Sequence, residues 1–171
     1  MKIFVSKNSI FILFSCLLFT HTIAENNSAV NDKKDIVRKK TSVEVGIESI
    51  KENGDNVVIN IYSINEVPIA GVQFEIKPNN LFLIDSLSGG RCGDLDFMLR
   101  SNQRGVLLGF SMSGTLIPIS TDSKLENNIL FSAYGKKIKD INNQVISLET
   151  TIAGKAGIKI NSKSNEYIYK K

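Results

Sequence analysis

The sequence predicts an all-β fold, a two-layer antiparallel β-sandwich of about nine strands with jelly-roll topology. Three observations predict it. Apolar and polar residues alternate in short runs, turn residues separate these runs at spacings of roughly 8 to 15 residues, and no ten-residue segment shows a convincing helical period. A Greek-key connection fits the same pattern, so the pattern alone does not decide between the two topologies.

The first two strands are predicted to form a hairpin. Residues Val43 to Ile47 alternate between β-branched and small or polar side chains, and the alternation resumes from Val57 to Ile61. Between the two runs, Asn53 and Gly54 supply the positive backbone angles that a tight reversal needs.

The third and sixth runs have two unlike faces. In the third, Ile69 to Ile76, we expect the larger apolar residues to face the core and the intervening ones to face solvent. In the sixth, Val106 to Met112, we place Leu108, Phe110 and Met112 in the core because the alternate positions are mostly small and polar. The predicted outward positions of the two runs are Gly71, Gln73, Glu75, Gly109, Ser111 and Ser113.

The remaining runs are short and apolar, with turn residues between them. A Gly-rich loop, Ser88 to Gly93, follows the fourth run, and the reversal Asn102 to Gly105 joins the fifth run to the sixth. The tail from Asn161 is polar, and we expect it to fray. The other predicted strands are Leu81 to Ile84, Phe97 to Arg100, Ile129 to Tyr134, Gln144 to Thr151 and Gly157 to Ile160.

The N-terminal segment predicts export. Residues 1–24 combine two lysines, the apolar run Ile10 to Phe19 and a small residue, Ala24, at a plausible cleavage position, which is typical of a signal peptide. Lipid attachment at Cys16 is the alternative. Cleavage would leave 147 residues (171 − 24), which we divide into a disordered linker over 25–41, one folded domain over 42–160 and a polar tail over 161–171. The predicted product is secreted or at the cell surface, with no transmembrane segment after cleavage.

Charge and residue types exclude several functions. Removal of the leader would lower the formal charge from +4 to +2, because residues 1–24 carry two lysines and no acid, and this balance argues against nucleic acid as a partner. The single histidine, His21, lies in the predicted leader. The exported chain would then lack the imidazole that nucleophile activation and most zinc sites use, so we expect no enzyme and no catalytic residue.

Two further features are candidate sites. Asp94 and Asp96 lie beside the Gly-rich loop, where they predict loop solvation or weak calcium ligation rather than an acid and base pair; no other cofactor or metal is expected. Cys92 would be the single cysteine of the exported chain, so it is either a plain buried or loop thiol or a link between chains.

Taken in order, the strands resemble the cohesin modules of polysaccharide-degrading assemblies. The resemblance covers about Ser42 to Ile160. It is carried by VEV at 43–45, by GD at 54–55 leading into VVINI at 57–61, by IAGVQFEI at 69–76 followed by Pro78 and Leu81, and by VLLGFSMSGTLIP at 106–118.

The resemblance implies a function. Cohesins hold dockerins through one exposed sheet face, and the likeness implies that the third and sixth strands contribute to such a face here. The expected partner is therefore a dockerin-type module, and a polysaccharide is a further candidate. Two alternatives are a carbohydrate-binding module of similar shape and a structural or adhesive surface protein.

Overall fold

The computed structural model describes residues 42–102 and 105–170. The predicted signal peptide over 1–24 and linker over 25–41 lie outside the described residues. Within the described residues, no helix has the length and apolar character needed to cross a membrane.

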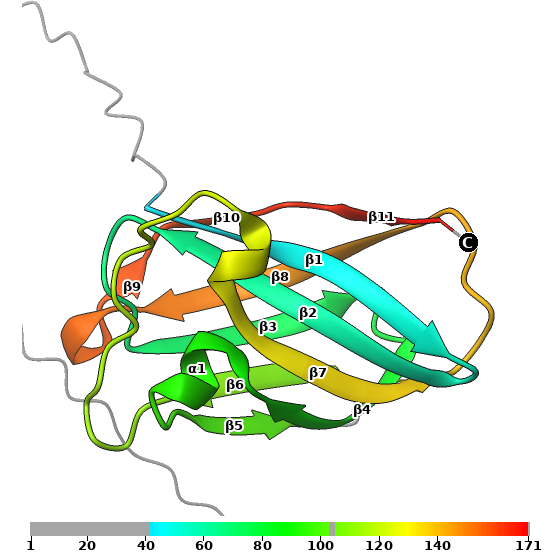
Figure 1. The fold of residues 1–171 in the computed structure, drawn as a ribbon, viewed down its shortest axis with the longest axis horizontal. Coiled ribbons are helices and arrows are strands. Elements are labelled where there is room, and N and C mark those ends of the chain that lie inside the picture. The colour runs from blue at the N-terminus through cyan, green and yellow to red at the C-terminus, as the bar shows by residue number, and fades with distance from the viewer. Residues whose placement is uncertain (1–41, 103–104, 171) are drawn as a thin grey trace, which may run out of the picture. The chain divides into compact units, whose positions relative to one another are not determined.

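Two β-sheets stack face to face, with β1, β2 and β7 in one layer and β8, β3 and β6 in the other (Figure 1). The first sheet has the order β10 (Ser162–Ser164), β1 (Val43–Asn53), β2 (Asn56–Asn65), β7 (Ile129–Lys137) and β4 (Phe82–Ser88). The second has the order β11 (Tyr167–Tyr169), β8 (Gln144–Ala153), β3 (Gly71–Lys77), β6 (Val106–Phe110) and β5 (Met98–Ser101), and β9 (Lys159–Ile160) also pairs with β8. The predicted two-layer all-β sandwich is confirmed.

The core lies between the two sheets and is built from the inward positions of both. Phe74 from β3 and Phe131 from β7 meet across it with ring centroids 5.9 Å apart. Neither residue is exposed to solvent. Alternation places the apolar members of each strand on one side, and this side faces the other sheet. The fully buried aliphatic residues around the two rings include Ile59, Ile61, Ile69, Ile76, Leu107, Leu130, Ile146 and Ile152.

The predicted hairpin is confirmed, and its strands are longer than expected. β1 and β2 pair antiparallel from Val43 opposite Asn65 to Asn53 opposite Asn56. Gly54 has φ 63°, a conformation in which glycine avoids the steric cost of a side chain. The reversal therefore uses the residues that predicted it.

The prediction that the tail frays is wrong for the described residues. β10 pairs in parallel with β1, and β11 pairs antiparallel with β8, so the tail joins both sheets. Tyr169 is only 6% exposed, and its hydroxyl donates a hydrogen bond to the Glu52 carboxylate on β1. With these two strands, residues 42–102 and 105–170 contain eleven strands. Each of these strands has only three paired residues, and alternation cannot identify a strand that short from the sequence.

Within the described residues, three short helical segments interrupt the strands, and one of them, η2 (Lys155–Gly157), follows β8. The predicted Gly-rich loop contains the helical turn α1 (Gly90–Asp94), and the loop after β6 contains η1 (Leu125–Asn128). Cys92 points from α1 into the core and has no exposed surface, and this burial raises the pKa of its thiol to about 12. The buried-thiol interpretation therefore fits this residue, because a link between chains needs a reachable sulfur.

The Arg91 side chain closes one end of the sandwich with hydrogen bonds. Its Nη1 donates to Asn65 Oδ1 at 2.9 Å, to the Ser63 carbonyl at 3.1 Å and to Ser120 Oγ at 3.2 Å. Its Nη2 donates to the Pro118 carbonyl. The guanidinium thus connects α1, the end of β2 and the loop that leads to β7.

Candidate functional site

The outer side of the second sheet carries the candidate site, which we call the front face. Opposed residues of antiparallel strands project to the same side of a sheet, so the pairing register arranges the outward residues in rows across the strands. The rows follow from the register of β8 with β3, of β3 with β6 and of β6 with β5. Row one is Ala153, Gly71, Phe110 and Met98; row two is Thr151, Gln73, Leu108 and Arg100; row three is Glu149, Glu75 and Val106.

Row one is apolar and has a notch at its centre. Gly71 lies between Ala153 and Phe110, and a Cβ built on it would be 3.5 Å from the nearest atom, the Gly109 carbonyl oxygen. The absence of a side chain leaves a hollow of about 340 Å³, which Leu108 and Thr151 also line. A partner backbone can approach the sheet closely at this point.

Row two mixes polar and apolar side chains. Gln73 and Thr151 are exposed neighbours on β3 and β8, and Leu108 is half-buried beside them on β6. Arg100 ends the row on β5, the edge strand of this sheet. The row therefore offers hydrogen-bonding groups next to an apolar surface.

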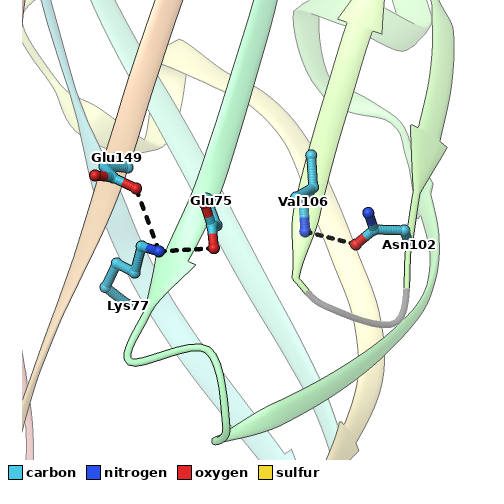
Figure 2. Close-up of polar contacts among 5 residues, drawn as sticks. All are labelled: Glu75, Lys77, Asn102, Val106 and Glu149. Carbon is cyan, nitrogen blue, oxygen red and sulfur yellow. Dashed lines mark hydrogen bonds and ion pairs between the residues drawn. The ribbon is translucent and has the colours of Figure 1, made fainter. Parts of the chain in front are cut away.

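Row three is charged, and its acidic residues share one lysine. The Lys77 Nζ atom lies 2.7 Å from Glu75 Oε1 and 3.2 Å from Glu149 Oε2 (Figure 2). The hydrogen bond to Glu75, supported by Glu149, raises the pKa of the Lys77 ammonium. Two carboxylates and one ammonium leave this group with one net negative charge. A hollow of about 230 Å³ lies beside it, lined in part by Gln73 and Thr151.

The turn between β5 and β6 fixes one end of row three. The Val106 backbone amide donates to Asn102 Oδ1 at 3.0 Å (Figure 2). The Asn102 backbone amide donates to the Val106 carbonyl, also at 3.0 Å. Gly105 has φ 78° and supplies the left-handed residue that the turn uses. Val106 is thereby held opposite Glu75.

On β3, the predicted orientation agrees with the structure. Val72, Phe74 and Ile76 are buried, Gln73 is exposed, and Gly71 and Glu75 are half-buried on the outer side. The prediction that these three residues bind a partner is not tested by the fold.

On β6, the predicted orientation is reversed. Leu107 has no exposed surface and Gly109 is buried, whereas Leu108 and Phe110 are half-buried on the outer side. Gly109 faces inward because it lies opposite Val72 on β3. A Cβ on Gly109 would come within 3.1 Å of Val72 Cγ2 and 3.2 Å of Leu99 Cδ2, so the core leaves no room for a side chain there. A glycine that we interpreted as an open docking position is therefore a packing position.

Ser111 and Ser113 lie beyond the end of β6 and not on an outward strand face. Ser111 Oγ lies 3.0 Å from Ser113 Oγ, and Ser113 Oγ lies 2.8 Å from Thr115 Oγ1. The Thr115 amide donates to Ser111 Oγ at 2.9 Å, so these hydroxyls stabilise a polar turn. Met112, which we placed in the core, is 75% exposed on the same turn.

Sequence patterns missed most of the apolar part of the front face. The alternation on β6 predicts Leu108 and Phe110 in the core, and no local pattern marks Met98, Ala153 or Thr151 as outward residues of one face. The missing signal was the pairing between strands. Gln73 faces outward, and in the pairing of β3 with β8 it lies directly opposite Thr151. The pairing therefore identifies Thr151 as an outward residue of the same face.

No metal centre is evident among the described residues. They contain no group of three or more histidine, cysteine, aspartate or glutamate side chains that could hold a metal ion. Asp94 ends α1, and Asp96 follows it with φ 55°. Weak calcium ligation by this pair stays a prediction.

Comparison with known proteins finds the fold but no close relative. No protein-family model matches the chain, and no curated protein matches its sequence. Among the solved structures that match its fold are two with a TM-score of 0.50 each. One is a chain of the CaDoc0917–CaCohA2 complex, a dockerin–cohesin complex, with 16% identity over 74% of this chain and 99% of that one.

The second solved structure is a non-cellulosomal cohesin from the hyperthermophilic archaeon Archaeoglobus fulgidus. It is 12% identical, and the match covers 75% of this chain and 91% of that chain. At these identities the comparison shows a shared fold. The cohesin-like sandwich that the strand order predicts is thereby confirmed.

Proposed function

We propose that this chain is an exported, non-catalytic binding module that holds a dockerin-type protein on its front face. The observation that carries the proposal is the apolar part of that face, where Leu108 and Phe110 lie beside the Gly71 notch on the outer side of a sheet. The cohesin-like fold supports the choice of partner class. The predicted signal peptide supports export to the cell surface or beyond, in a polysaccharide-degrading or other surface assembly.

The front face suits a partner helix better than an extended peptide. A peptide strand would need a free sheet edge, whereas Gly71 and its neighbours lie on β3, inside the sheet. A helix can set a small or apolar side chain into the notch and cover Leu108 and Phe110. Removal of apolar surface from water supplies about 25 cal/mol per Å², and the polar side chains of row two give orientation.

Binding without catalysis fits the residue types at the face. It carries carboxylates, a lysine, an arginine, amide and hydroxyl groups, and no histidine or cysteine. Glu75 and Glu149 both contact Lys77, so their carboxylates form part of an ion-paired group. Such a group serves recognition.

Capture of a panel of dockerin-type modules by the chain tests the proposal. Leu108→Glu places a charge in the apolar area, and we expect it to abolish capture of any module that the native chain binds. Tyr134→Glu is the matched control, because Tyr134 is an exposed side chain on β7, on the outer side of the other sheet. Failure of the native chain to capture any module, or equal loss in both variants, would contradict the proposal. A glycan array run in parallel tests the carbohydrate alternative.

A further inference from the structure

A second apolar hollow lies at one end of the sandwich and shares no residue with the three rows of the front face. Its volume is about 520 Å³, larger than either hollow on that face. Its walls come from the connection between β2 and β3, the loop after β6, and the segment around β9. The apolar wall residues are Val67, Pro68, Leu116, Ile158 and Ile160.

Backbone hydrogen bonds hold the rim of this end hollow in place. The Gly154 amide donates to the Ile158 carbonyl at 2.8 Å, and the Gly157 amide donates to the Gly154 carbonyl at 3.1 Å. A Cβ on Gly154 would lie 2.9 Å from Ile160 Cδ1, so the glycine lets that wall residue pack against the backbone. The shape of the hollow therefore belongs to the folded chain and does not depend on an occupant.

The same turn holds an apolar side chain in solvent. Ala156 has φ 57°, an uncommon conformation for a residue other than glycine, and Gly157 follows with φ 73°. Ile158 comes next and is 69% exposed at the edge of the hollow. This side chain extends the apolar wall of the hollow into solvent, where an occupant can cover it.

The charges at the rim have one sign. Among the described residues that line the hollow, the charged ones are Lys155 and Lys159, and none is a carboxylate. Within residues 42–102 and 105–170, neither lysine forms an ion pair. An occupant that complements these walls has an apolar body and a negative charge.

We propose that the end hollow binds a small amphiphilic anion, an apolar body that carries one carboxylate or sulfonate. The volume falls within the range of about 300 to 1,000 Å³ that is usual for small-molecule sites. The apolar body packs against Leu116, Ile158 and Ile160, and the acid group lies between the ammonium groups of Lys155 and Lys159. The site is separate from the front face and does not depend on the partner proposed there.

Two fluorescent probes with similar apolar bodies test this site on the full chain. 8-Anilinonaphthalene-1-sulfonate carries a charge, and N-phenyl-1-naphthylamine is neutral. We expect saturable binding of the sulfonate, weakened about tenfold at low salt by Lys155→Glu with Lys159→Glu, since exposed ion pairs contribute a few-fold each. Binding of the neutral probe should change less than about twofold. Ile158→Asn should weaken both probes and, at an exposed position, leave the fold intact.

Matched controls keep the outcome interpretable. Lys51→Glu with Lys136→Glu makes the same change of charge at exposed lysines outside the hollow, and it should leave the sulfonate bound as in the native chain. Amide NMR signals of Gly154 and Gly157 should shift with the sulfonate. The proposal is overturned if these signals stay fixed when the sulfonate is added, or if both double variants weaken its binding equally.

Discussion

Truncation of the two neighbouring leucines on β6 should cost very different amounts of stability, because Leu107 lies in the core and Leu108 on the front face. Leu107→Ala removes three carbons from a side chain with no exposed surface. Transfer of these groups to water costs about 2.4 kcal/mol at roughly 0.8 kcal/mol for each, and the cavity left behind adds to this. We therefore expect a loss of about 3 to 4 kcal/mol in the free energy of unfolding.

Leu108→Ala should cost about 1 kcal/mol or less, since the side chain is half-buried on the outer side and opposes Gln73. Urea unfolding followed by far-UV circular dichroism measures both values, and unchanged slopes against urea show that the two variants are comparable. For a domain of this size the first change lowers Tm by roughly 10 to 15 °C. Equal losses, or a larger loss for Leu108→Ala, would refute the strand orientation and the front face with it.

Three further outcomes follow from the buried polar groups. Arg91→Met should lower the free energy of unfolding by about 2 to 4 kcal/mol in the same urea assay, because it leaves the oxygens of Asn65 and Ser63 without a charged donor. A loss below 0.5 kcal/mol would contradict this. Burial and the hydrogen bond to Glu52 raise the pKa of Tyr169 from 10.0 to about 12, so the folded chain holds this proton more tightly than the unfolded chain. The free energy of unfolding should therefore fall as pH rises from 10 to 12, and this fall should be smaller in Tyr169→Phe. An identical dependence on pH in the native chain and the variant would contradict the raised pKa of Tyr169. The Cys92 thiol, with a pKa near 12 and no exposed surface, should react with a disulfide reagent only after unfolding in urea, and fast reaction of the folded chain would show that the end near α1 opens.

Local patterns predicted the elements well where a strand is long and two-sided. The run at Val57 to Ile61 and the Asn53–Gly54 reversal carry their own evidence, because alternation and turn residues act between near neighbours in the chain. The short strands β10 and β11 carry almost no local evidence of this kind. Their stability comes from partners more than a hundred residues earlier in β1 and from β8.

The candidate site was half predictable for a related reason. β3 has one apolar and one polar side, so Gln73 was oriented correctly. β6 has a leucine on each side, and the pattern alone favoured the side of Leu108 as the core side. Tertiary packing sets the orientation instead, since Val72 and Leu99 occupy the space where a side chain at residue 109 would lie. Pairing information would have been needed to see this.

Filling the notch tests the central claim, that a protein partner docks on the front face. A valine at Gly71 meets no atom closer than 3.5 Å at its Cβ, so Gly71→Val should fold and melt like the native chain while its side chain occupies the hollow. Ser86→Val adds similar bulk at an exposed position of β4, on the other sheet. Calorimetric titration with the dockerin-type module that the native chain captures should show affinity at least about tenfold weaker for Gly71→Val and unchanged for Ser86→Val. Native affinity in Gly71→Val would contradict the account.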